Sequence, residues 1–489
     1  MVRLAEMWSQ LQLEPEATTP LYRQLFEKIR DKILTGDLSS GSRIPATREL
    51  AGLIGLNRTT VSAAYELLER EGFLRAHVGR GSFVERPTPV ATRPDPAGYT
   101  DPSLARSKPI ISFATSRPEA ELFPLDECRL TISEVTAGDL GRILQLGSPL
   151  GFEPLREYMR GQLEASGALS PGDEVLITSG CQQAQDLLVR TLVQPGDLVL
   201  LEDPVYPGLR ETLNRAGARL GGIPVTAAGL DLSEAGRLLQ RERAKLLFVT
   251  PTFQNPTGAT LPRAARLDLI RLAAARGVTI VENDVYSALR YEGEPIPSIK
   301  QLAPAGDVIQ LGSFSKIAFP GLRVGWIVAA RHIVEACAAT KQWMDLHSDH
   351  LSQAVVLRFA ESGRLAEHRK CVVAAGARKL TAALDACSRY LPEGSQFTRP
   401  SGGMNLWVRL PAPLDASALL RAAEEQGVAY LPGKHFAVGR PEPGSLRLSF
   451  AGLSVERIVE GIALLGDLFT QELRRERLGG VTRQVTAMV

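Results

Sequence analysis

Apolar side chains near the start of the chain recur every fourth residue, which is the spacing of one face of an α-helix. They are Leu21, Leu25, Ile29 and Ile33. Two shorter apolar patterns, from Pro45 to Gly55 and from Thr59 to Glu71, predict two further helices joined by a turn that contains glycine. Two short helices joined in this way have the proportions of a helix-turn-helix.

Two strand-like runs follow the third predicted helix. Phe73–His77 and Ser82–Val84 flank the segment Val78–Gly81, whose glycines allow the positive φ angles of a tight hairpin. Together with the three helices, this hairpin predicts a winged helix-turn-helix of the α+β class in the first part of the chain.

The apolar periodicity stops between Arg86 and Pro109, where prolines stand among small and polar residues. Such a composition predicts a semi-extended tether. We therefore expect four parts: a winged-helix domain at 1–85, a Pro-rich linker at 86–110, a larger domain at 111–472 and a tail at 473–489.

Five apolar runs alternate with helical patterns in the larger domain. They are Val175–Thr178, Leu198–Leu201, Lys245–Val249, Val278–Val281 and Val308–Leu311. Buried runs of this length, separated by helices, are typical of a mostly parallel sheet in an α/β domain. Polar strings follow the carboxyl ends of these runs, where open α/β sheets place their ligands.

Composition excludes several classes of protein. The 56 Lys+Arg and 54 Asp+Glu leave a net charge of only +2, so any basic surface must be local. The five cysteines form no C-x-x-C pair, so we expect neither a disulfide framework nor a metal site. The first residues lack a signal-peptide core and no apolar run approaches membrane-spanning length, so we expect a soluble, cytoplasmic protein.

Six strings within residues 20–84 closely resemble the GntR type of winged helix. They are Gly41-Ser-Arg-Ile-Pro45, Thr47-Arg-Glu-Leu-Ala51, Thr59-Thr-Val61, Tyr65-Glu-Leu-Leu-Glu69, Glu71-Gly-Phe-Leu74 and Gly79-Arg-Gly-Ser-Phe83. The resemblance implies that the third helix enters the major groove of double-stranded operator DNA. It places Arg48, Arg58, Thr59 and Thr60 at the DNA and Arg80 at the wing tip. Arginine suits this task, since it pairs with phosphate or guanine.

Five strings of the larger domain resemble the fold-type I aminotransferases that use pyridoxal 5'-phosphate. They are Thr178-Ser-Gly180-Cys181-Gln182, Glu202-Asp-Pro-Val-Tyr206, Gln254-Asn255-Pro-Thr-Gly258, Glu282-Asn283-Asp284-Val-Tyr286 and Ser313-Phe-Ser315-Lys316. The resemblance implies an α/β domain with a large and a small subdomain.

The same resemblance implies a role for each residue. Lys316 would form the Schiff base with the cofactor, and Tyr206 would stack on its ring. Asn255 and Tyr286 would bond its phenolic oxygen. The phosphate would be held by Gly180, Cys181, Gln182, Ser313, Ser315 and Arg323. A sixth string, Ser445-Leu-Arg447-Leu-Ser-Phe450, resembles the segment whose arginine binds a substrate carboxylate.

Two departures from that pattern bear on the chemistry. Leu146 stands where these enzymes usually place a tyrosine that reaches the neighbouring subunit's phosphate. The acid at the ring nitrogen commonly lies three residues before the tyrosine, which selects Asn283, whereas a spacing of two selects Asp284. The choice matters because a carboxylate keeps the ring nitrogen protonated and an amide does not.

The joint pattern resembles the MocR/GabR family of bacterial transcriptional regulators. It implies a head-to-tail homodimer whose larger domain senses pyridoxal 5'-phosphate, with an amino acid or amine as effector. The alternative is a working aminotransferase that carries a DNA-binding appendage.

Overall fold

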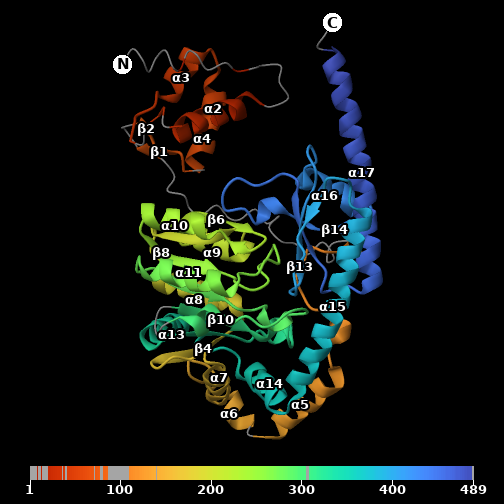
Figure 1. The fold of residues 1–489 in the computed structure, drawn as a ribbon. Helices are drawn as coiled ribbons and strands as arrows, with labels where there is room; N and C mark the ends of the chain where they lie inside the picture. Colours follow the sequence, from red (N-terminus) through yellow and green to blue (C-terminus); the bar gives the residue numbers. More distant parts are fainter. Residues whose placement is uncertain are drawn as a thin grey trace. The chain divides into compact units, whose positions relative to one another are not determined.

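The computed structural model describes residues 8, 13, 20–35, 37–38, 41–70, 72–77, 81–85, 110–138, 140–303 and 308–486. The chain divides into two compact units, Met1–Tyr99 and Thr100–Val489, which are described one at a time (Figure 1).

The small unit contains three helices and a hairpin. These are α2 (Leu21–Thr35), α3 (Thr47–Ile54), α4 (Arg58–Arg70), β1 (Leu74–His77) and β2 (Gly81–Val84). The strands pair antiparallel, with Leu74 opposite Val84. The predicted winged helix-turn-helix is therefore confirmed, although residues 78–80 at its wing tip lie outside the described part of the chain.

Local signals fix the turn between α3 and α4. Gly55 ends α3 with φ of 69°, a left-handed conformation that glycine adopts without strain. Asn57 then caps α4, because its Oδ1 accepts the N–H of Thr60 at 2.8 Å and the hydroxyl of Thr59 at 2.8 Å. This cap starts the helix at Arg58, one residue before the predicted start.

The predicted helical faces form the core of this unit. Leu25, Ile29, Leu50 and Val61 have no exposed surface. Trp8 also packs into this core with 1% of its surface exposed, although its sequence context predicted no element.

The large unit is built on an eight-stranded sheet in the order β4-β11-β10-β9-β8-β5-β6-β7. Its strands are β4 (Asp173–Thr178), β5 (Leu198–Asp203), β6 (Arg219–Thr226), β7 (Gly229–Leu230), β8 (Ala244–Val249), β9 (Thr279–Asn283), β10 (Val308–Ser313) and β11 (Gly325–Ala330). The five predicted strands are β4, β5, β8, β9 and β10. Strand β11 runs antiparallel to both of its neighbours, whereas β5, β6, β8, β9 and β10 form parallel pairs.

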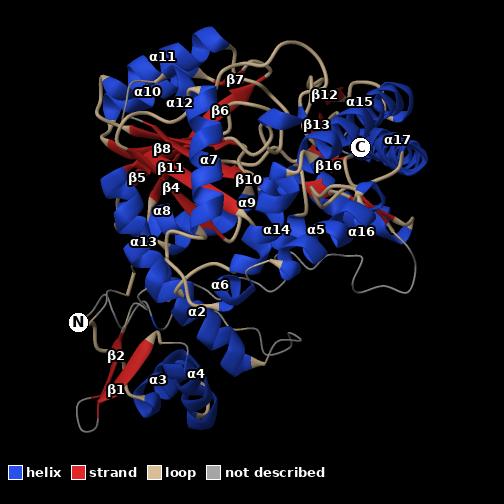
Figure 2. Cartoon of the chain, turned by 90° about the horizontal axis from the view of Figure 1, so that it is seen from below, coloured by secondary structure: helices blue, strands red, loops and turns tan. Residues whose placement is uncertain are grey.

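Helices cover both faces of this sheet (Figure 2). One face packs against α8 (Cys181–Leu192), α9 (Pro207–Arg215) and α13 (Arg331–Asp345). The other packs against α10 (Leu232–Arg241), α11 (Arg263–Ala274) and α12 (Ile299–Leu302). The helices α5 (Leu125–Ala137), α6 (Leu140–Leu144), α7 (Glu153–Ser166) and α14 (His350–Glu361) continue the layer beyond β4. This layered α/β architecture confirms the predicted fold class.

A second, smaller sheet has the order β12-β13-β16-β15. Its strands are β12 (Gln396–Phe397), β13 (Asn405–Arg409), β15 (Leu431–Pro432) and β16 (Ser445–Ser449), and it packs with α15 (Arg364–Tyr390), α16 (Ala416–Glu425) and α17 (Val455–Thr486). The boundary expected at residue 472 lies inside α17. At the start of the large unit, β3 (Ile111–Ser112) pairs in parallel with β14 (Val428–Ala429). None of the described helices is long and apolar enough to cross a membrane.

Candidate functional site

The site begins where two parallel strands end. In the pairing of β9 with β10, Asn283 lies opposite Leu311, so the residues that follow both strands meet at one edge of the sheet. Lys316 ends a short 3-10 turn (Phe314–Lys316) after β10. Its Nζ lies 5.8 Å from the centre of the Tyr286 ring and donates a 2.7 Å hydrogen bond to the carbonyl oxygen of Ser116.

The surroundings of Lys316 favour its neutral amine. Burial is the main cause that lowers its pKa to about 8, and the positive charges of Arg447 and Arg323 add to the effect. Among the described residues, no carboxylate forms an ion pair with Lys316 or with Arg323. Positive charge without a carboxylate partner makes this site suitable for an anion.

A cradle for an anion lies at the start of α8. Gly180 precedes the helix with φ of 80°, and a Cβ at this position would lie 2.4 Å from Arg323 Nη2. Gly325 approaches equally closely, because a Cβ there would lie 2.8 Å from the carbonyl carbon of Gly180. The first N–H groups of a helix have no partner within it, and Arg323 lies beside Gly180, immediately before the first N–H groups of α8, those of Cys181 and Gln182.

Two serine hydroxyls precede Lys316. Ser313 Oγ accepts the N–H of Ser315 at 3.1 Å, and the two hydroxyl oxygens are 2.9 Å apart. Both side chains are buried. Ser313, Ser315 and Lys316 thus lie within one turn at the end of β10.

The structure places Asn283 and Asp284 in different surroundings. The Cys181 thiol donates to Asn283 Oδ1 at 3.4 Å, so Asn283 faces the first turn of α8. Asp284 instead bonds to Ser287, and burial, opposed by that bond and by the charge of Arg266, raises its pKa. Alternation along an extended chain sends neighbouring side chains to opposite faces.

Arg447 and Asn255 bring the smaller sheet to this edge. Arg447 Nη1 donates to Asn255 Oδ1 at 3.0 Å, and its Nη2 donates to the carbonyl oxygen of Ala114. Asn255 Nδ2 in turn donates to the Tyr286 hydroxyl at 3.4 Å. Burial raises the Tyr286 pKa to about 12, with the Arg447 charge opposing it.

Tyr206 and Gln182 lie at the rim of the site. Tyr206 precedes α9 with 39% of its surface exposed, and its proximity is one of the causes that raise the Tyr286 pKa. Gln182 Nε2 donates to the Thr212 hydroxyl of α9 at 3.3 Å.

The sequence did not predict the segment that crosses the site. The carbonyl groups of Ala114 and Ser116 accept hydrogen bonds from Arg447 and Lys316. The residues near them form no strand or helix, so no periodicity could have revealed them. Further along, Glu119 bonds Lys379 of α15 at 2.5 Å.

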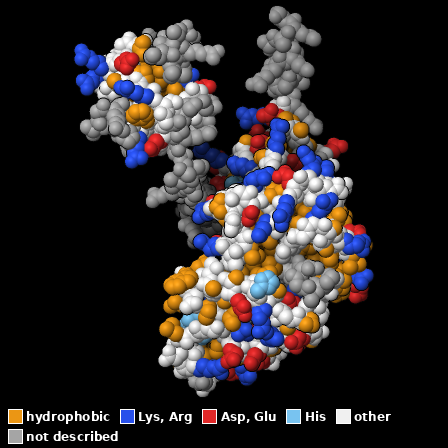
Figure 3. Space-filling model, turned by 90° about the vertical axis from the view of Figure 1, so that its left-hand side faces the viewer, with side chains coloured by type: hydrophobic (Ala, Val, Ile, Leu, Met, Phe, Trp, Pro, Cys, Tyr) orange, Lys and Arg blue, Asp and Glu red, His pale blue; other side chains and the backbone are white. Residues whose placement is uncertain are grey.

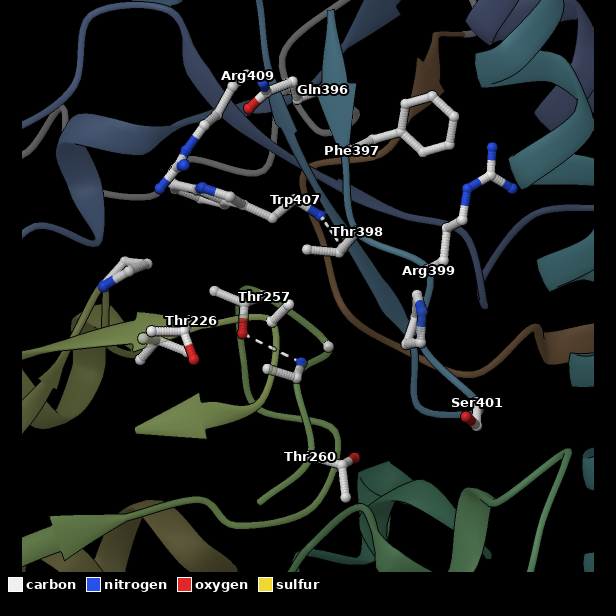
Figure 4. A pocket seen from close by; sticks show the side chains of 16 residues that line it. Thr226, Thr257, Thr260, Gln396, Phe397, Thr398, Arg399, Ser401, Trp407 and Arg409 are labelled. Carbon is white, nitrogen blue, oxygen red and sulfur yellow. Dashed lines mark hydrogen bonds between the residues drawn. The ribbon is translucent and has the colours of Figure 1, made fainter. Parts of the chain in front are cut away.

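A cleft of about 560 Å³ lies elsewhere, between the β6–β7 hairpin, the loop 257–260 and β12–β13. Figure 4 shows the Thr226, Thr257 and Trp407 side chains that line it. The Thr257 hydroxyl bonds Gln254 at 2.7 Å, and Arg409 pairs with Glu442 at 2.8 Å. No lysine among the described residues lines this cleft, so it lacks the amine that the Lys316 site offers.

The predicted DNA-contacting residues of the small unit lie at the starts of two helices. Arg48 is in the first turn of α3, and Arg58, Thr59 and Thr60 form the first turn of α4. Arg48, Arg58 and Thr59 are exposed and Thr60 is half-buried. Figure 3 shows further Lys and Arg side chains spread over the visible face of this unit, with a few Asp and Glu among them. Arg80 lies outside the described residues.

Two family models match the chain. One, described as aminotransferase class I and II, matches residues 119–465, and the other, described as bacterial regulatory proteins of the gntR family, matches residues 21–84. The chain is 31% identical to the probable rhizopine catabolism regulatory protein MocR of Rhizobium meliloti, over 94% of this chain and 96% of that relative. It is 37% identical to the 2-aminoadipate transaminase of Thermus thermophilus, over 74% of this chain and 91% of the enzyme.

Solved structures resemble the large unit. A kynurenine aminotransferase of Pyrococcus horikoshii superimposes with a TM-score of 0.73 at 33% identity, covering 77% of this chain and 98% of that one. The α-aminoadipate aminotransferase of Thermus thermophilus, complexed with N-(5'-phosphopyridoxyl)-L-leucine, gives 0.70 at 35% identity, covering 75% and 93% of the two chains.

Proposed function

The chain belongs to the class I and II aminotransferase family and joins that domain to a GntR-type module as MocR-type regulators do; on this basis we propose that it is a transcriptional regulator sensing pyridoxal 5'-phosphate together with an amino acid or amine. The observation that carries the proposal is the anion cradle beside Lys316, on a chain that also has a DNA-binding module. A regulator of this kind acts on chromosomal DNA, which supports the expected cytoplasmic location.

The residues present fit pyridoxal 5'-phosphate. Gly180 has no Cβ, which lets the Arg323 guanidinium lie against the start of α8, and the helix amino terminus favours a phosphate there. Lys316, with its pKa lowered to about 8, offers an amine to an aldehyde. When bound, the cofactor supplies that aldehyde and an electron-withdrawing ring. Ser313, Ser315, Cys181 and Gln182 would hold the phosphate, Tyr206 would cover the ring, and Asn255 and Tyr286 would bond its phenolic oxygen.

We infer that Asn283, rather than Asp284, faces the ring nitrogen. Asn283 lies on the side of Cys181 and the α8 amino terminus, whereas Asp284 bonds Ser287 and interacts with Arg266. An amide does not hold a proton on a ring nitrogen as a carboxylate does, so ligand binding would persist where turnover is slow.

The substitution Asn283→Asp tests this assignment. We expect the pH dependence of the bound cofactor's absorbance to change in this variant, because a carboxylate raises the pKa of the ring nitrogen. Asp284→Asn is the matched control and should leave the spectrum as in the parent. The assignment is wrong if Asp284→Asn changes the spectrum and Asn283→Asp does not.

Exposed apolar side chains support a homodimer. Leu146 is 78% exposed and Trp343 is 89% exposed. Their segments lie side by side, because a Cβ at Gly147 would overlap the His350 ring, whose centre lies 4.4 Å from the centre of the His347 ring. An exposed apolar patch marks an interaction site. We propose that a second copy of the chain covers this patch in a head-to-tail homodimer. Trp343→Ser should shift the mass measured by sedimentation toward that of the monomer.

We propose that the small unit binds duplex DNA through the first turns of α3 and α4, with Arg80 at the wing. Paired modules of a dimer would bind a repeated half-site. Arg58 and Arg48 supply the positive charge, and the amino terminus of α4 adds the helix dipole.

Arg447 would select effectors that carry a carboxylate, because its guanidinium can form two parallel hydrogen bonds with one.

A second candidate function is transamination. The identity with the 2-aminoadipate transaminase over three quarters of the chain favours it. Two measurements on full-length protein separate the candidates: the affinity for promoter DNA with and without cofactor and amino acid, and turnover of amino-acid and keto-acid pairs. Turnover near the enzyme median of about ten per second, with DNA affinity unchanged by any ligand, would favour the enzyme.

A further inference from the structure

One short segment lies across the ligand side of the site. We call residues 114–119 the strap. The Ala114 carbonyl accepts from Arg447 Nη2, and the Ser116 carbonyl accepts from Lys316 Nζ at 2.7 Å. The Ser116 side chain also bonds Tyr286. The strap thus contacts three of the groups to which a cofactor or effector would bind.

Both ends of the strap are anchored. Before it, Phe113 is fully buried; its N–H donates to the Ala429 carbonyl at 2.8 Å, and its carbonyl accepts from the Ser449 N–H at 3.0 Å. At its other end, Glu119 bonds Lys379 Nζ at 2.5 Å. Residues 114–118 between the anchors belong to no helix or strand, so they can shift without breaking a sheet.

Arg447 can accept a carboxylate only by exchanging a contact. Its side chain is only 3% exposed, and its guanidinium already bonds Asn255 Oδ1 and the Ala114 carbonyl. Asn255 is fixed by its second bond to Tyr286 and by burial. The Ala114 carbonyl belongs to the irregular strap and is the contact that yields.

The strap also lines a narrow pocket beside Lys316. The pocket bounded by Lys316, Glu119, Lys379 and Met404 has a volume of only about 20 Å³. That is close to the room of a single water molecule. An effector side chain that extends into this pocket therefore meets Pro118 and Glu119 of the strap, which line it.

We propose that the carboxylate of an amino-acid effector displaces the strap from Arg447, and that this displacement carries the state of the site toward the DNA-binding unit. Only Ser112 and Phe113 separate Ala114 from Ile111, where β3 starts, and the chain before β3 continues through the linker 86–110 to residues 20–85. A ligand that displaces Ala114 therefore acts within three residues of the start of β3. This inference rests on the proposed function, since it assumes that the chain binds both DNA and a carboxylated amine.

Hydrogen exchange of the cofactor-loaded full-length protein tests the displacement. The probes are three amino acids, each beside the amine that lacks its carboxylate: L-alanine and ethylamine, L-phenylalanine and phenethylamine, and L-lysine and cadaverine. We expect at least one amino acid, and not its amine, to speed exchange in the peptide covering residues 114–118. The idea is overturned if none of the three amino acids changes that peptide, or if the amines change it equally.

A second experiment tests transmission to DNA. Glu119→Gln frees the strap from Lys379, and the double variant Glu119→Gln with Lys379→Gln does so without leaving a buried charge. The matched control is Glu367→Gln, which removes an exposed ion pair with Lys370 on the same helix, α15. In the parent we expect the active amino acid to change DNA affinity by about 5- to 150-fold, and in the strap variants we expect this ratio to fall toward one.

The two levels of the proposal fail differently. If the parent takes up no cofactor or binds no DNA, the proposed function is wrong. If the parent does both and the strap variants keep its full ligand-dependent change in DNA affinity, the strap inference alone is overturned. Cofactor absorbance of each variant shows that the site itself is intact.

Discussion

Two groups of charged side chains at the large sheet show how differently one fold uses charge. The first, which we call the buried network, consists of Asp173, Lys300 and Glu282. Lys300 Nζ bonds Asp173 at 2.8 Å and the Val308 carbonyl at 2.8 Å. Glu282 accepts the N–H groups of Ile299 at 2.7 Å and Lys300 at 2.9 Å. Its members hold one another and expose almost no surface.

The second group consists of Lys316, Arg323 and Arg447. Their hydrogen bonds go to neutral oxygens of the chain, and those of Arg323 are long, at 3.4 Å. Backbone carbonyls are acceptors that a phosphate or carboxylate can replace, because charge-assisted bonds to anions are stronger. The two groups together show that burial alone does not identify a functional charge. What distinguishes the site is positive charge whose partners can be exchanged.

The largest effect should follow removal of the lysine amine from the second group. Lys316→Ala should abolish the covalent attachment of pyridoxal 5'-phosphate completely, because Lys379, which lines the same pocket, is held in an ion pair by Glu119. The measurement is the mass of the protein after borohydride reduction. Lys370→Ala, at the surface, should keep the adduct. An adduct that survives in Lys316→Ala would remove the distinction between the two groups.

Removal of a lysine from the buried network should instead affect stability. Lys300→Met leaves the Asp173 carboxylate buried and unpaired, at a cost of about 3–5 kcal/mol. Urea unfolding of the large unit measures the loss, and Lys370→Met, which breaks an exposed pair, should change little. If Lys300→Met unfolds at the parent's midpoint, the network does not have the structural role assigned to it.

The comparison extends to the small unit, where Arg58 is exposed on the α4 first turn and Arg30 bonds Asp31 at 2.8 Å. Arg58→Ala should weaken DNA binding and reduce the salt slope by about 0.9 for each phosphate that the variant no longer neutralises. Arg30→Ala should leave the slope unchanged. Titrations at several salt concentrations measure it, and equal slopes for parent and Arg58→Ala would place the DNA face elsewhere.

The smallest effect concerns pH. Because the folded Lys316 pKa is lowered to about 8, its neutral amine becomes more abundant as pH rises toward that value. The rate of cofactor attachment should therefore rise with pH and level off above about 8. After burial, the charge of Arg447 is the next cause that lowers the Lys316 pKa. Arg447→Met removes this charge, so the Lys316 pKa should rise and the attachment rate should level off at a higher pH. A profile identical to the parent's would show that the two cations do not interact.

Local patterns predicted most of the secondary structure because they depend on nearby residues. The four-residue spacing indicated α2. Gly55 and Asn57 set the turn that follows α3, and the five apolar runs formed strands of the large sheet. The runs of β6 and β11 were missed. Strand β6 has glycines and only one fully buried residue, Ile223, and β11 follows the site strings without a helix to separate it from β10.

The amino-acid sequence alone was enough to establish the two modules and the order of the site strings, since turn chemistry, helix caps and apolar periods act over a few residues. The packed fold was needed to show which neighbouring side chain faces the first turn of α8. Asn283 and Asp284 differ by one position, and the alternation of extended backbone sends them to opposite sides. The fold also brought Glu119 to Lys379 and Ala114 to Arg447, across 260 and 333 residues. Contacts over such distances leave no local period in a chain, because they form only when packed sheets bring remote segments together.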